Sequence, residues 1–258
     1  MESVDWHLKK SGNPEEFIEI LRSERRDILD RLRETRFSLL KNGYPHSQVI
    51  PYASYSPWLA DELFLNVFSM AKENTMVDIY RCYELYCFAK QMVDVPGAFM
   101  EVGVWRGGSA AVLASAAPHK EVHLFDTFNG VAKADHRFDT LYVGGEHADA
   151  SEHQVMQIFE KMDLKCHIHA GIFPEETLSG LPECISFAHI DVDTYSSAKD
   201  AFRAIWARVS PSGMVVFDDY GTFGCEGVSQ LVQELAQAFR NAVFIHNLNG
   251  HAIFVKKH

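Results

Sequence analysis

The sequence lacks an excess of basic residues, paired cysteines and any long hydrophobic run. Its 24 Lys and Arg residues are outnumbered by 35 Asp and Glu residues, which gives a formal net charge of −11 over 258 residues. Nucleic acid and anionic membrane surfaces are therefore poor partners, because both attract a basic face of a protein. No apolar run approaches the roughly 20 residues that are needed to cross a bilayer. We expect a protein that binds neither nucleic acid nor a membrane.

The cysteines are few and show no pairing pattern. There are five of them, and no two have the CxxC spacing. A secreted disulfide-rich domain has many more, in even number. Residues 1–5 also lack the basic and apolar regions of a secretory signal. We therefore expect buried thiols and a cytoplasmic protein, and the 47% of hydrophobic residues is ample for a packed core.

Residues 1–94 are predicted to form an N-terminal helical region. Asn13 as N-cap, followed by Pro and Glu in the first turn, is typical of a helix start. The helix is expected to run to about residue 41, with Asn42-Gly43 as its stop. Its apolar stripe either packs on the rest of the chain or meets a second subunit. We predict a homodimer or a higher homo-oligomer.

Residues 44–60 are rich in proline and aromatic side chains. Three prolines in this span exclude a regular helix or a central strand. The segment either packs statically on the core or forms a mobile lid over a bound ligand. Helical spacing returns over 61–94 and leads to a turn at Val95–Gly97. The lid hypothesis assigns substrate contacts to Tyr52, Tyr55 and Trp58.

Residues 95–258 are predicted to form an α/β domain with a mostly parallel sheet, because strand-like and helix-like segments alternate. The last two strands flank a short turn at Asn247–Gly250, so they should form an antiparallel hairpin at the sheet edge. Residues 129–153 are a polar insertion in which His136 and His147 are candidate substrate contacts. Strands are expected near 98–103, 121–126, 166–170, 186–191, 213–218, 242–246 and 251–256.

Two of these strands end abruptly in carboxylates. Asp191 and Asp193 follow one apolar run, and Asp218 and Asp219 follow the next. In an open α/β sheet, ligands bind at the carboxyl ends of the strands, so the four side chains should share one crevice. Their mutual repulsion favours a bound divalent cation with oxygen ligands. The alternative is that water surrounds them and that they cap the following helices, as Asp193 would do for a helix beginning near Ser196.

The turn after the first predicted strand is similar to a dinucleotide-binding fingerprint. Gly103 and Gly108 fit its outer glycines, but Trp105 replaces the middle glycine that lets backbone approach a pyrophosphate. NAD and FAD are therefore disfavoured. S-adenosylmethionine fits better, since it has no phosphate and its positive groups suit an acidic pocket that Glu101 faces. Asp126 ends the next strand, where a carboxylate accepts ribose hydroxyls; alternatively, the glycines serve only close strand–helix packing.

Six motifs together resemble the macrocin O-methyltransferase family over residues 75–220. They are Thr75-Met76, Glu101–Gly108, Phe125–Gly130, Ala170–Leu178, His189–Tyr195 and Phe217–Tyr220, in the order and spacing of the family. The resemblance implies a class I methyltransferase (Rossmann-like) fold of seven strands, S-adenosylmethionine as methyl donor, and Mg²⁺ or another divalent cation. It also implies a small-molecule glycoside as acceptor. The departures lie at 131–155 and in the lid segment, which are the parts expected to contact the acceptor.

The resemblance assigns roles by position. Asp191, Asp218 and Asp219 correspond to metal ligands, and Asp193 corresponds to the general base, with Asp191 beside it in catalysis. On an unbroken strand Asp191 and Asp193 would point to the same face. The donor site would comprise Glu101, Gly103, Trp105, Gly107, Gly108, Ser109, Asp126 and Gly171.

Alternatives remain open at this point. A metal-dependent phenol or catechol O-methyltransferase would place acidic ligands at the same two strand ends. A non-catalytic protein that binds S-adenosylmethionine is a different class, and a nicotinamide dehydrogenase is disfavoured by Trp105. His136, His147 or His189 is the rival base. His167 and His169 share one strand face but lack a third ligand for zinc.

Overall fold

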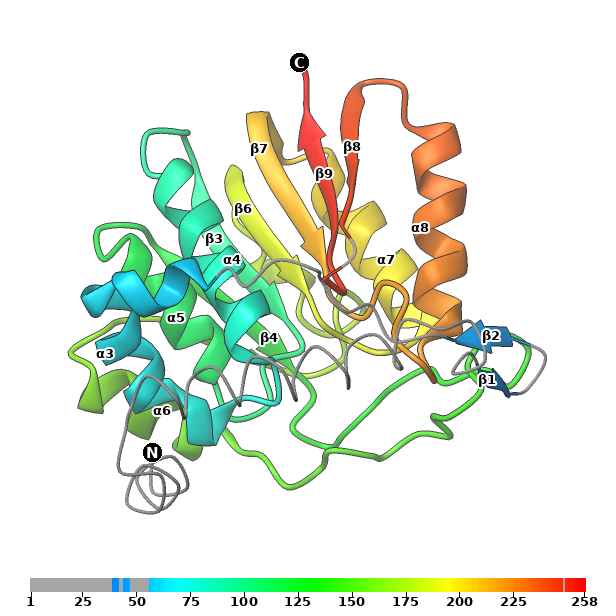
Figure 1. Cartoon of the computed structure of the whole chain (residues 1–258), viewed down its shortest axis with the longest axis horizontal. Coiled ribbons are helices and arrows are strands. Elements are labelled where there is room, and N and C mark those ends of the chain that lie inside the picture. Colours follow the sequence, from blue (N-terminus) through cyan, green and yellow to red (C-terminus); the bar gives the residue numbers. More distant parts are fainter. Residues whose placement is uncertain (1–38, 42–43, 47–55, 248) are drawn as a thin grey trace, which may run out of the picture. The chain divides into compact units, whose positions relative to one another are not determined.

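The computed structural model describes residues 39–41, 44–46, 56–247 and 249–258 (Figure 1). The chain divides into two compact units, Met1–Tyr55 and Ser56–His258. Residues 56–94 therefore belong with the sheet, and the boundary lies earlier in the chain than the predicted one at residue 94.

The first unit contains one short antiparallel pair, β1 (Leu39–Lys41) and β2 (Tyr44–His46). The predicted helix therefore does not reach residue 41. Asn42-Gly43, interpreted above as a helix stop, is also the dipeptide that most favours a two-residue hairpin turn. Pro45 is tolerated because each strand of a two-stranded sheet is an edge strand. The rest of the predicted helix, together with Tyr52 and Tyr55, lies outside the described residues.

The second unit is built on one sheet, whose order is β5-β4-β3-β6-β7-β9-β8. The pairs from β5 to β7 are parallel, whereas β9 is antiparallel to both β7 and β8. All seven predicted strands are present, so the predicted α/β fold with a C-terminal antiparallel hairpin is confirmed. The strands are β3 (Ala98–Val102), β4 (Val122–Asp126), β5 (His167–Ala170), β6 (Ile185–Ile190), β7 (Val209–Phe217), β8 (Ala242–His246) and β9 (Ala252–Lys256).

Helices cover both faces of this sheet (Figure 1). One face carries α3 (Glu62–Ala71), α4 (Ile79–Gln91), α5 (Gly108–Ala116) and α6 (Glu152–Lys161). The opposite face carries α7 (Tyr195–Trp206) and α8 (Glu226–Ala238). Single 3₁₀ turns lie at Pro57–Ala60, Lys72–Asn74 and Leu178–Gly180. No helix within the described part of the chain is long and apolar enough to span a bilayer.

Local sequence accounts for where several helices begin. Asp61 and Asp78 are the N-caps of α3 and α4, and their carboxylates accept backbone N–H groups of the first turn at 2.9–3.0 Å. Ser151 plays the same part for α6. Such caps stabilise a helix by about 0.5–2 kcal/mol each, because the first N–H groups have no partner within the helix.

Buried side chains alternate between the two faces of the sheet. Along β3, Phe99 packs with α3–α6 and Met100 with α7 and α8; Phe187 and Ala188 divide in the same way along β6. This alternation is what a parallel sheet with two covered faces requires. All five cysteines are free thiols. The prediction that they are buried holds for Cys82 and Cys225, whereas Cys87 and Cys166 are half-buried and Cys184, just before β6, is exposed.

Candidate active site

Neighbouring parallel strands end level with one another, and this alignment builds the site. The register joins their last paired residues in one row: Phe125, Val102, Ile190 and Phe217. The next backbone N–H of three strands donates across the row, from Gly103, Asp191 and Asp218, at 2.8–2.9 Å. These three residues therefore leave the sheet side by side. The carboxyl end of the sheet is where an α/β fold binds its ligand.

Gly103 permits the strand ends to approach. Its φ of +85° lies in the left-handed region, and a Cβ there would lie 1.6 Å from the carbonyl oxygen of Asp191. Gly108 similarly admits the backbone of Asn74, 2.6 Å from a Cβ at that position. Gly107, at φ +86°, packs on Val155 of α6. These three glycines thus permit close packing, and Gly103 also lines the cavity.

Asp126 organises the glycine turn. Its Oδ2 accepts the backbone N–H groups of Val104 (2.6 Å) and Trp105 (2.8 Å), and its Oδ1 accepts that of Phe128 (2.7 Å). A carboxylate offers about four acceptor positions. Asp126, which also lines the cavity, therefore retains capacity for about one further donor.

The irregular segment 127–151 covers the same end of the sheet and is tied to the glycine turn. The indole Nε1 of Trp105 donates to Asp149 Oδ1 at 2.8 Å, and Arg106 pairs with Asp149 Oδ2 at 2.5 Å. The Arg106 guanidinium also stacks on the Trp105 ring, 4.3 Å from its centre. Arg106 is therefore an ion-pair partner that holds this segment.

A second attachment joins the segment to the loop after β6. Asp139 Oδ1 accepts the backbone N–H of Tyr195 at 2.9 Å, so Asp139 caps α7. The hydroxyls of Thr194 and Ser197 donate to the carbonyl of Ala132 at 3.1 and 2.9 Å. The segment is thus fixed directly over the strand ends.

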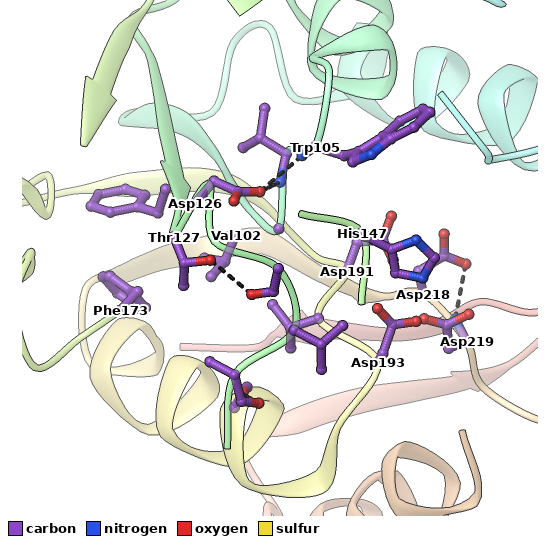
Figure 2. A pocket seen from close by; sticks show the side chains of 18 of the residues that line it. Val102, Trp105, Asp126, Thr127, His147, Phe173, Asp191, Asp193, Asp218 and Asp219 are labelled. Atoms are coloured by element: carbon purple, nitrogen blue, oxygen red, sulfur yellow. Dashed lines mark hydrogen bonds between the residues drawn. The ribbon is translucent and has the colours of Figure 1, made fainter. Parts of the chain in front are cut away.

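The four predicted aspartates line one cavity (Figure 2). β6 ends at Ile190, so Asp191 and Asp193 lie beyond the regular strand, and the argument from alternation does not apply to them. Asp193 and Asp219 both have a φ of +62°. Left-handed residues other than glycine are uncommon and concentrate at functional sites. The two loops therefore bring their carboxylates together through turns rather than through strand geometry.

The carboxylates differ in their electrostatic environment. Burial raises the pKa of Asp191 and Asp219 well above the usual range, and the charge of Asp218 adds to this effect. Burial also raises the pKa of Asp193, which accepts a hydrogen bond from Tyr142. Burial acts in the same direction on Asp218, but the nearby positive groups outweigh it and hold its pKa below the ordinary value.

Those positive groups come from three distant segments. Arg81 of α4 donates directly to Asp218 Oδ1. His251 Nε2 lies 3.7 Å from Oδ1, and His189 Nε2 lies 3.9 Å from Oδ2. Asp218 is consequently the member of the cluster that stays ionised most readily. Its neighbours prefer to be neutral unless a cation joins them.

The structure divides the predicted site residues into groups. Those that line the cavity are Gly103, Trp105, Ser109, Asp126, His147, Gly171, Asp191, Asp193, Asp218 and Asp219. Glu101 is fully buried and hydrogen-bonds to His189, and neither it nor Gly107 nor Gly108 lines the cavity. His136 is exposed on the segment 127–151 and lines no part of the cavity. Trp58 packs on Tyr80, with ring centres 4.8 Å apart, and does not line the cavity either.

Several lining residues were not singled out from the sequence. No sequence pattern singled out Arg81, because its partner Asp218 lies 137 positions away in the chain. Tyr142 was hidden within the polar insertion, although an aromatic residue there was a possible sign. Cavity-lining Thr75 and Met76 had appeared only in the family resemblance.

Residues 67–257 match the model of the macrocin O-methyltransferase family. The chain belongs to this family. It is 32% identical over 169 residues to the 8-demethyl-8-(2,3-dimethoxy-alpha-L-rhamnosyl)-tetracenomycin-C 4'-O-methyltransferase of Streptomyces olivaceus, across 59% of this chain and 64% of that protein. It is 28% identical over 167 residues to the demethyldecarbamoylnovobiocin O-methyltransferase of Streptomyces niveus, across 58% and 63%. The match thus spans just under two thirds of the length of either relative.

Solved structures share the fold. The O-methyltransferase NovP superposes with a TM-score of 0.61 at 22% identity, over 72% of this chain and 83% of that one. The calicheamicin methyltransferase CalS11 gives 0.54 at 17% identity, over 81% and 98%. The predicted class I methyltransferase fold is thereby confirmed.

Proposed function

We propose that the protein is an S-adenosylmethionine-dependent O-methyltransferase that acts on a sugar hydroxyl of a glycosylated natural product or its precursor, with Mg²⁺ or another divalent cation. The observation that carries the proposal is the pair of aspartate-bearing strand ends beside a glycine turn in one cavity. Membership of the family and the activities for which its relatives are named, which include a rhamnosyl-tetracenomycin methyltransferase, support a glycoside acceptor.

The donor is proposed to bind at the glycine turn. Gly103, Trp105 and Ser109 line the cavity, as do Asp126 at the end of β4 and Gly171 directly after β5. The same cavity is also lined by the four aspartates. A donor bound at the glycine turn would therefore share one cavity with the proposed cation site.

Asp191, Asp218 and Asp219 are proposed to hold the cation. Buried ionised carboxylates repel one another, so a positive charge beside them stabilises the group, and Mg²⁺ prefers oxygen ligands. Burial and the charge of Asp218 raise the pKa of Asp191 and Asp219, and a bound cation would favour their ionised forms. When bound, the cation supplies a Lewis acid that lowers the pKa of the acceptor hydroxyl, and the donor supplies an electrophilic methyl group.

Asp193 is proposed to accept the proton of the acceptor hydroxyl. Burial raises its pKa, which makes it a stronger base than an ordinary aspartate, and the Tyr142 hydroxyl orients it. The competing role as cap of α7 is filled elsewhere, because the N-cap is Thr194 and Asp139 accepts the N–H of Tyr195. General-base catalysis typically contributes about 10²–10⁴-fold.

The direct test is an assay with labelled S-adenosylmethionine against matched panels of deoxysugar glycosides and catechols. We expect transfer to a glycoside that stops on chelation and returns with Mg²⁺. Asp219→Asn should abolish it, whereas Asp163→Asn should not. Asp163 is an exposed aspartate with a left-handed φ of +54°, so it reproduces the backbone context of Asp219. Transfer to catechols alone, or binding of S-adenosylhomocysteine without transfer to either panel, would overturn the proposal.

A further inference from the structure

Two fully buried histidines lie beside Asp218 and do not line the cavity. His189 belongs to β6, and His251 directly precedes β9. Both side chains have no exposed surface. Their Nε2 atoms lie 3.9 and 3.7 Å from the Asp218 carboxylate, and neither nitrogen has a hydrogen-bond partner. Buried polar atoms without partners are rare in folded proteins, so this arrangement requires an explanation.

The opposite nitrogen of each ring is held by a glutamate. His189 Nδ1 lies 2.7 Å from Glu101 Oε1, and His251 Nδ1 lies 2.5 Å from Glu84 Oε2. A carboxylate accepts, so each ring donates a proton from Nδ1. A metal ion would bind the other nitrogen, Nε2, which faces Asp218, and would replace any proton there. A histidine that ligates a metal shows this pattern, with a carboxylate fixing the tautomer and the ring orientation.

The distances from the two Nε2 atoms to the Asp218 carboxylate suit a shared metal ion better than direct hydrogen bonds. At 3.7–3.9 Å the Nε2–carboxylate distances exceed those of a hydrogen bond. One ligand atom from each of the three residues lies within 4.8 Å of the other two. Two ligands that are each about 2.0–2.2 Å from a common zinc ion lie roughly 3–4 Å apart. Modest closure of the three side chains would therefore bring all three ligand atoms within bonding distance of one ion.

The ligand atoms of the three residues indicate which metal ion would bind. Two imidazole nitrogens and one carboxylate suit zinc, cobalt, manganese or iron, whereas Mg²⁺ prefers oxygen ligands alone. Arg81 and the backbone N–H of Asp219 both donate to Asp218 Oδ1. Oδ2, which faces His189, is the oxygen that remains available.

We propose that His189, His251 and Asp218 form a second metal site, for a divalent transition ion, with Glu101 and Glu84 orienting its two histidines. Asp218 is shared with the all-oxygen site, so an ion here would fix this carboxylate from its far side. The assignment does not depend on methyl transfer or on the acceptor. It stands on the buried ligand geometry alone.

The test uses full-length protein stripped of metal and titrated with Co²⁺, whose visible absorption reports nitrogen ligands. It is done in the Asp191→Asn background, which removes a ligand of the all-oxygen site. We expect one Co²⁺ per chain in that background. His251→Gln should weaken Co²⁺ binding by at least 100-fold and Glu84→Gln by about 10–100-fold, the usual range for an orienting partner. His119→Gln, a change at an exposed histidine, should leave affinity unchanged.

Wild-type protein provides a measurement that no folding defect can obscure. With Mn²⁺ as the probe, electron spin-echo envelope modulation should show coupling to imidazole nitrogen. Only oxygen ligation of bound Mn²⁺, or wild-type Co²⁺ affinity in folded His251→Gln, would overturn the proposal and leave the two histidines as charged partners of Asp218. Neither readout involves methyl donor or acceptor, so a failure here is distinct from a failure of the proposed methyltransferase activity.

Discussion

Replacing Gly103 by alanine tests how the site is assembled. The new Cβ would lie 1.6 Å from the carbonyl oxygen of Asp191, so the two backbones would have to separate by about 2 Å to reach van der Waals distance. That shift displaces a proposed metal ligand directly. A misplacement of about 1 Å in a catalytic group can cost about 10²-fold in rate. We expect Gly103→Ala to lower kcat/KM for methyl transfer at least about 100-fold.

Gly221→Ala is the matched control. Gly221 has the same φ of +85°, but a Cβ there meets no atom within 4 Å. Both variants carry the left-handed penalty of about 1–2 kcal/mol, which lowers Tm by roughly 2–8 °C in a domain of this size. Only Gly103→Ala adds the collision with the backbone of Asp191. Thermal unfolding and steady-state kinetics on both variants separate the two effects. Equal activity losses in the two variants would refute the reasoning.

Three further predictions concern the carboxylates and the segment 127–151. Mg²⁺ at 100 times its Kd should stabilise the wild type by about 2.7 kcal/mol, which raises Tm by roughly 5–11 °C. Asp219→Asn should abolish this rise in Tm, whereas Asp163→Asn should retain it. An unchanged rise in Asp219→Asn would contradict the metal assignment. Because burial raises the pKa of Asp193 and a base must be ionised, kcat/KM should rise with pH through a limb above the ordinary aspartate range. Asp193→Asn should remove that limb and about 10²–10⁴-fold of turnover; its persistence would point to another base. Asp149→Ala should lower the free energy of unfolding by less than about 1 kcal/mol, because the ion pair between Asp149 and Arg106 is exposed. The same change should raise the KM for the donor, because it releases Trp105. An unchanged KM would show that this attachment has no part in donor binding.

The strands and their acidic ends were predictable because each carries its own signal. β6 is buried at every position and is followed directly by Asp191. β7 is buried over its last five residues and is followed directly by Asp218. Parallel strands with two covered faces read as continuous apolar runs, and the carboxyl-end rule then places their terminal residues together. Few assumptions about tertiary structure were needed.

Contacts between distant segments were not predictable in this way. Arg81 and His251 reach Asp218 from α4 and from the turn before β9, and nothing near them in the sequence indicates it. Glu101 was expected to face the donor, but β3 pairs it directly with His189 of β6. Cross-strand neighbours on one face of a sheet interact, so the register decided the role of Glu101. The register depends on the whole sheet and is only weakly encoded in any single strand.

The asymmetry among the carboxylates has a consequence for how a cation enters. Asp218 is ionised first, because positive groups hold its pKa below the ordinary value, whereas burial keeps the pKa values of Asp191 and Asp219 raised. A cation held by these three residues would therefore bind one carboxylate that is already ionised and would displace protons from the other two. Metal binding that releases protons strengthens as pH rises. Conversely, the metal-free protein should lose stability as pH rises through those raised pKa values, since the folded state then holds buried charges that the unfolded chain exposes to water. The carboxylates that destabilise the metal-free protein are therefore the ones that would make the metal-bound protein specific for a divalent ion.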